Sequence, residues 1–225
     1  MNEEQETFKN YFEDIKKIWS KLNNPNRIIP FCAPLIMRPD FLIIGTNHSN
    51  NFDKNQSKNE EIADSFAIEI AKENTFLTHN HPFAEGLKDV VNLVQNDFKD
   101  FKISPKWVGT NRCAIQTDSR GLGDITKNIN YAECEKEMDT LLKNFIKFCR
   151  PKNIILTGKH ACGLFYADKN LKEMKPKKIL KESCNVIPIW HLSELWRWDR
   201  YDQESFKTKT INRIVSSIQN GYCEI

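Results

Sequence analysis

The chain lacks the features of a membrane protein and of a disulfide-rich secreted protein. No apolar run in its 225 residues is long enough to span a membrane. The acidic N-terminus has no apolar segment like that of a signal peptide. Seven cysteines are scattered along the chain, with no C-x-x-C pair and no Cys/His zinc spacing. We therefore expect a cytoplasmic protein whose thiols are reduced and mostly buried.

The chain also lacks a large excess of charge of either sign. Its 33 Lys and Arg residues oppose 30 Asp and Glu residues, so the formal net charge is +3. This mild basicity permits nucleic-acid binding without indicating it. No internal repeat and no low-complexity tail interrupts the chain. We expect a single domain over 1–225, with an N-terminal helix and connection over 1–37 and an insertion over 50–80.

The apolar residues change their spacing along the chain in a way that predicts alternating helices and strands. Helices are expected over 3–22, 85–97, 131–149 and 204–218, with a further helix start over 159–165. Strands are expected over 41–45, 107–116, 153–158 and 185–190. Strands that alternate with helices indicate an α/β fold, in which helices cover both faces of a parallel sheet.

Two of the expected strands run directly into polar residues. Residues 41–49 read F-L-I-I-G-T-N-H-S, and residues 186–193 read V-I-P-I-W-H-L-S. Ligands bind at the carboxyl ends of strands in open α/β sheets, so the two segments predict one shared cleft. The simpler interpretation is an ordinary strand followed by a turn.

The polar stretch over 50–80 is long for a loop inside a compact domain, which is typical of a lid or an insertion. His48, His79 and His81 lie in or beside it, and the last two form an H-N-H sequence. No acidic residue stands at a convincing spacing from His79 and His81. We therefore predict no metal site and no cofactor.

Four short motifs occur in a defined order within 38–196. They read L-I-I-G-T-N, H-P-F-A-E-G-L-K-D-V-V, G-T-N-R-C and I-W-H-L-S-E-L, and the strand–helix unit R-P-K-N-I-I-L-T-G-K-H-A precedes the last. In this order they resemble the water-binding, base-stacking, base-reading and His-Pro-Ser motifs of the uracil-DNA glycosylase superfamily. The resemblance implies a three-layer α/β/α fold with a central four-stranded parallel sheet.

The resemblance also implies a role for individual residues in cleaving an N-glycosidic bond. Asn47 would orient the attacking water, and His191 would donate a hydrogen bond to the departing base. The base-binding residues implied by the motifs are Thr46, His48, Phe83 and Asn111, with Phe83 stacking on the base and Asn111 reading its edge. The implied DNA contacts are Ser49, Lys159, Ser193, Leu195, Trp196 and Arg197, with Leu195 or Trp196 as the wedge that fills the gap in the duplex.

The chain departs from the family at the motifs themselves. His48 stands where the family usually has proline, and Leu192 replaces the proline of the His-Pro-Ser motif. Asn47 and Phe83 are also farther apart in sequence than in the family. The hypothesis is therefore a monomeric DNA glycosylase that removes uracil or a modified pyrimidine, in DNA repair or phage defence.

Other interpretations of the same residues stay open. Asn47 fits a turn, Asn111 a strand-end cap, Phe83 the core and His191 a half-buried structural role. The alternatives for the whole chain are an inactive DNA-binding or sensor protein of the same fold and a small-molecule enzyme of another α/β class.

Overall fold

In a computed structural model of the chain, the described residues are 3–22, 36–46, 82–97, 106–114, 126–167, 170–172, 174–181, 183–191 and 203–222. Within these ranges, no helix combines the length and the apolar character needed to cross a membrane. The five cysteines in them, at positions 113, 134, 149, 162 and 184, are buried free thiols.

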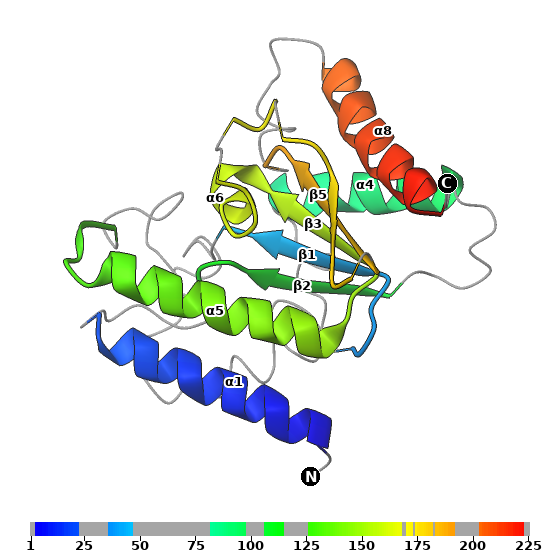
Figure 1. Cartoon of the computed structure of the whole chain (residues 1–225). Coiled ribbons are helices and arrows are strands. Elements are labelled where there is room, and N and C mark those ends of the chain that lie inside the picture. Colours follow the sequence, from blue (N-terminus) through cyan, green and yellow to red (C-terminus); the bar gives the residue numbers. More distant parts are fainter. Residues whose placement is uncertain are drawn as a thin grey trace.

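A five-stranded sheet forms the centre of the molecule (Figure 1). Its strands are β1 (Phe41–Gly45), β2 (Trp107–Asn111), β3 (Asn153–Thr157), β4 (Lys177–Ile179) and β5 (Cys184–Ile189). Their order is β2-β1-β3-β5-β4. β1, β2, β3 and β5 pair in parallel, as predicted, so the α/β fold class is confirmed.

The prediction of a four-stranded, wholly parallel sheet was wrong at one edge. β4 pairs antiparallel with β5, so the sheet is mixed. Leu180 and Lys181, with φ values of 53° and 55°, turn the chain back onto β5 immediately after β4. Lys177 and Lys178 remain exposed, and charged side chains on an edge strand discourage pairing with another molecule.

The helices follow the apolar periodicity closely. Their bounds are α1 (Glu3–Ser20), α4 (Pro82–Asp97), α5 (Tyr131–Cys149), α6 (Gly158–Cys162) and α8 (Gln203–Tyr222). The expected helix over 131–149 has the same bounds in the structure. The expected insertion over 50–80 lies outside the described residues.

Both faces of the sheet are covered, which explains the continuous apolar sequence of its central strands. Leu42 and Ile44 of β1 pack on one face with α5 and α6, while Phe41 and Ile43 pack on the other with α4 and α8. All four side chains are at most 1% exposed. α1 lies outside α5, as Figure 1 shows, and its Ile18 packs against residues of α5.

Candidate functional site

The parallel strands end together at one edge of the sheet. Gly45 of β1 is level with Asn111 of β2, and Thr157 of β3 is level with Ile189 of β5. The Thr157 hydroxyl donates a hydrogen bond to the carbonyl of Ile44 at 3.2 Å, which ties β3 to β1 at the same height. The polar residues that follow these strands therefore emerge from a single edge, called here the carboxyl edge.

His191 lies at this edge, two residues beyond the end of β5. Its half-buried ring is tilted by 57° against Phe83, with the ring centroids 5.4 Å apart. A Cβ atom on Gly158 would lie 3.2 Å from the Cβ and 3.3 Å from the Cδ2 of His191. Gly158 also has a φ of +86°, which side chains disfavour. The imidazole thus rests on a glycine and against an aromatic ring from α4.

The other predicted residues within the described ranges lie along the carboxyl edge at different depths, with β1 and β3 between the strand of Asn111 and the strand that leads to His191. Asn111 is 4% exposed at the end of β2, so its amide belongs to the buried floor of the carboxyl edge. Thr46 is half-buried, and its carbonyl accepts a hydrogen bond from the Cys113 N–H at 2.9 Å. Lys159 is exposed on the first turn of α6. The structure therefore brings a histidine, an asparagine and a lysine to the same edge.

Phe83 differs from these residues because it is largely a core side chain. It is 8% exposed and packs with Phe41, Ile43 and Leu87 on the α4 face of the sheet. This burial is consistent with the alternative stated from the sequence, in which Phe83 is a core residue. The ring nevertheless contacts His191, so it supports the histidine from the side.

The remaining predicted site residues lie outside the described residues. They are Asn47, His48, Ser49, Ser193, Leu195, Trp196 and Arg197, and the histidines at positions 79 and 81 lie outside as well. Their roles therefore stay predictions.

A charged network that the sequence did not predict lies directly beneath the carboxyl edge. Arg112, the residue after Asn111, donates from Nε and Nη2 to the two carboxylate oxygens of Asp139, both at 2.7 Å. Its Nη1 donates to the carbonyl of His160 at 2.6 Å. The Arg112 and Asp139 side chains are 9% and 16% exposed. Burial lowers the pKa of Arg112, but the hydrogen bonds and the charge of Asp139 outweigh this effect and leave the pKa above its ordinary value, so the guanidinium stays charged.

Glu135 extends the network on α5. Its Oε1 lies 2.7 Å from Nε2 of His160 and 3.8 Å from Nη2 of Arg112. The hydrogen bond with His160 lowers the pKa of Glu135, and the charge of Arg112 also lowers it, against the opposing effect of burial. The Nδ1 atom of His160 is buried and has no hydrogen-bond partner among the described residues. A proton on Nε2 of His160 satisfies the contact to the carboxylate.

The network joins three elements around the candidate site: the end of β2, the helix α5 and the short helix α6. Gly163 is part of this arrangement, because a Cβ atom there would clash with Nη1 of Arg112. The sequence carried a partial signal, since Glu135 and Asp139 are four residues apart on a predicted helix and so share a face. Arg112 and His160 come from distant parts of the chain, and only the fold identifies them as partners.

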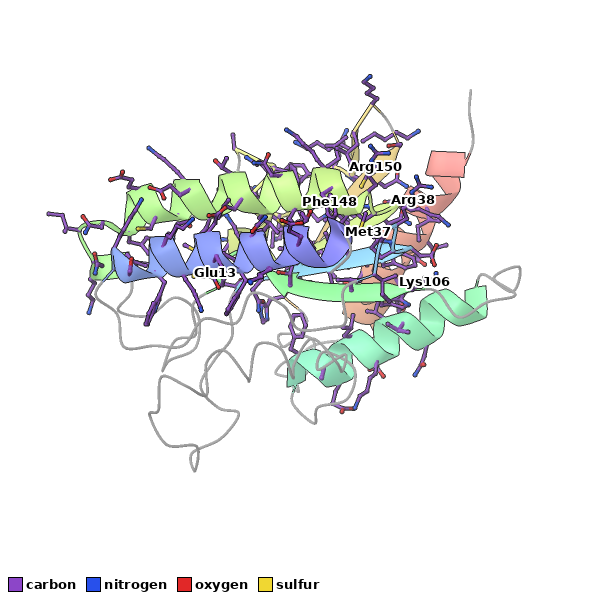
Figure 2. The ribbon with its side chains drawn as sticks, turned by 90° about the horizontal axis from the view of Figure 1, so that it is seen from below. Glu13, Met37, Arg38, Lys106, Phe148 and Arg150 are labelled. Atoms are coloured by element: carbon purple, nitrogen blue, oxygen red, sulfur yellow. The ribbon has the colours of Figure 1, made fainter. Side chains whose placement is uncertain are left out.

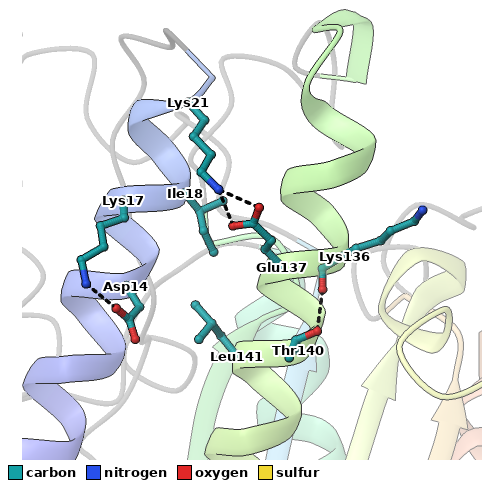
Figure 3. Close-up of a pocket in the computed structure, with 8 residues that line it drawn as sticks. All are labelled: Asp14, Lys17, Ile18, Lys21, Lys136, Glu137, Thr140 and Leu141. Atoms are coloured by element: carbon teal, nitrogen blue, oxygen red, sulfur yellow. Dashed lines mark hydrogen bonds and ion pairs between the residues drawn. The ribbon is translucent and has the colours of Figure 1, made fainter.

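A separate hollow lies between α1 and α5 (Figure 3). Among its lining residues, Lys17 pairs with Asp14 and Lys21 pairs with Glu137, each at 2.7 Å, and Ile18 and Leu141 supply apolar surface. None of the residues predicted from the sequence lines it. Because these charges satisfy one another and α5 separates the hollow from the sheet, we place the candidate site at the carboxyl edge instead.

The geometry of the carboxyl edge suits recognition of a polar ring and donation of a hydrogen bond to it. Asn111 offers an amide donor and acceptor, and His191 offers an imidazole held by packing on two sides. The charged network keeps the supporting elements in place. No model of a known protein family matches the chain, and no curated protein is detectably similar to it in sequence.

Proposed function

We propose that the chain is a DNA glycosylase that flips a uracil or a modified pyrimidine out of DNA and hydrolyses its N-glycosidic bond. The observation that carries the proposal is the position of His191, packed against Phe83 and Gly158 at the same sheet edge as Asn111. The proposal includes a glycosylase-like three-layer fold, in which β4 is an added edge strand. It also assigns the chain to DNA repair or phage defence.

In the proposed reaction, the bond between C1′ of the sugar and the ring nitrogen of the base breaks, and its electron pair leaves with the base. The oxygen of a water molecule, oriented by Asn47, bonds to C1′, and the proton that this water gives up is balanced by the proton that the departing base anion takes from solvent. His191 donates a hydrogen bond to the base as negative charge develops on it, which lowers the barrier to departure. Asn111 binds the edge of the extruded pyrimidine with both a donor and an acceptor.

The burial of Asn111 supports a role in selecting the base. If the extruded base becomes a partner of this amide, a base with the wrong edge leaves the amide unsatisfied, at a desolvation cost of roughly 1–3 kcal/mol. The imidazole of His191 is restrained on two sides, and restraint keeps a donor aimed at the atom that gains charge.

The test is release of the base from single- and double-stranded oligonucleotides, followed by alkaline cleavage of the abasic site. The panel contains uracil, hypoxanthine, thymine mispairs, and hydroxymethylated and glucosylated cytosine. We expect strand breaks with one of these bases, and we expect Asn47→Ala and His191→Ala each to reduce them at least 100-fold, on the scale of general acid–base and electrostatic contributions. The matched control is Asn92→Ala, which removes an exposed amide from the surface of α4.

Two outcomes would contradict the proposal. One is activity that survives both substitutions, because the assigned residues would then not carry the chemistry. The other is DNA binding without release of any base, which would favour the inactive DNA-binding protein of the same fold.

A further inference from the structure

The opposite edge of the sheet, where the parallel strands begin, gathers basic residues from three segments. The Phe41 N–H donates to the carbonyl of Lys106 at 3.1 Å, which places Lys106 beside the start of β1. The Lys152 N–H donates to the carbonyl of Pro39 at 3.0 Å. The Arg38 N–H donates to the carbonyl of Cys149 at 2.8 Å, next to Arg150. Backbone hydrogen bonds therefore hold these basic residues close together.

Arg38 and Arg150 occupy backbone conformations that do not favour arginine. Their φ values are 50° and 51°, in the left-handed region. Arg150 also ends α5, with its N–H donating to the carbonyl of Ile146 at 2.9 Å. Glycine or asparagine is the residue that suits such positions best. The two exposed arginines therefore bring positive charge that the turns themselves do not need.

The charge at this edge is only partly neutralised. Asp40 lies among the basic residues, and its Oδ1 accepts from Nζ of Lys152 at 2.7 Å while its Oδ2 accepts from the backbone N–H of Lys106 at 2.9 Å. Burial raises the pKa of Asp40, but these contacts outweigh it and leave the pKa below its ordinary value. The side chains of Arg38, Lys106 and Arg150 form no ion pair within the described residues.

Apolar side chains lie beside the two arginines. Figure 2 shows Met37 and Phe148 next to Arg38 and Arg150 near the C-terminal end of α5, and both apolar side chains are half-buried. Guanidinium groups bind phosphate oxygens in a fork geometry, and aromatic or apolar surface beside them accommodates a base. This combination is typical of a surface that binds a nucleic-acid strand.

We propose that Arg38, Lys106 and Arg150 form a second DNA-binding surface, called here the amino-edge surface, which contacts phosphates away from the base-flipping site. A five-residue strand spans roughly 13 Å from its first to its last Cα atom, so the two edges of the sheet bind different phosphates. The DNA must therefore extend several nucleotides past the flipped base or present a second segment. The choice of DNA as the polyanion rests on the proposed function.

The test measures binding to an unmodified 30-nucleotide single strand, labelled for fluorescence anisotropy, between 50 and 200 mM NaCl. The variant Arg38→Asn/Lys106→Gln/Arg150→Asn removes three charges and keeps residues that tolerate the left-handed conformation. Loss of three phosphate contacts lowers the slope of log Kd against log salt by about 2. The control Lys136→Gln/Lys143→Gln/Lys209→Gln removes the same charge from exposed positions of α5 and α8 and leaves the slope unchanged.

Two results would overturn the inference: a wild-type slope in the amino-edge variant, or an equal fall in both triple variants. A second measurement uses the unaltered protein, so it does not depend on folding of a variant. Bound oligonucleotide protects Lys106 from acetylation more than it protects Lys136, and equal protection would also overturn the inference. The strand contains no excisable base, so these results are independent of whether the protein releases bases.

Discussion

Replacing Gly158 with alanine tests the arrangement on which the candidate site depends. The glycine has a φ of +86°, and an added Cβ would lie 3.2 Å from the Cβ of His191. The left-handed backbone costs a residue with a side chain about 1–2 kcal/mol, and the close contact adds to this cost. We expect the free energy of unfolding to fall by about 2 kcal/mol in total.

Urea denaturation followed by circular dichroism measures this change. With a slope of about 2 kcal/mol per molar urea, the midpoint shifts down by about 1 M. Movement of His191 by a few tenths of an ångström also misaligns the proposed donor, so base release falls at least tenfold while DNA affinity is retained.

A double-mutant cycle separates the two causes. In a His191→Gly background the contact is gone, so Gly158→Ala then costs only the backbone strain. A loss of less than about 0.5 kcal/mol in the single variant would refute the reasoning, because it would mean that Gly158 is not held in a left-handed conformation against His191.

Three further predictions concern the network and the buried thiols. Asp139→Asn removes the charge that pairs with the buried Arg112, and we expect the free energy of unfolding, measured by urea denaturation, to fall by about 2 kcal/mol. The fall is limited because Glu135, 3.8 Å from Arg112, remains as a counter-charge. Unchanged stability would contradict this prediction. The pKa of Glu135 is below its ordinary value of 4.5, so its stabilisation is present above pH 4.5 and is lost as pH falls through the lowered pKa. Glu135→Gln should accordingly flatten the acid side of a plot of urea midpoint against pH, and an unaltered acid slope would speak against the assignment. Burial raises the pKa of the Cys162 and Cys184 thiols to about 12, so both should resist a disulfide reagent until the protein is unfolded, and rapid labelling of the native protein would contradict their burial.

The sequence by itself determined the main elements of this protein. Phe41–Gly45 and Asn153–Thr157 are short apolar runs rich in β-branched residues, and such runs favour buried parallel strands wherever helices cover both faces of a sheet. The apolar spacing over 131–149 predicts a helix with the bounds that α5 has. These features depend on neighbours within one turn or one strand, so they are visible in the local sequence.

Only the tertiary structure decided which distant residues meet. Arg112 and Asp139 are neutralised by each other, and His191 and Gly158 approach each other because β3 and β5 pair in a particular register. The antiparallel strand β4 likewise forms because a left-handed turn at Leu180 returns a lysine-rich segment to the edge of β5. Each of these contacts depends on strand order and on how helices pack against the sheet. Neither strand order nor helix packing is encoded in the spacing of residues along one segment. For this reason the candidate histidine could be named from the sequence, but its supporting network could not.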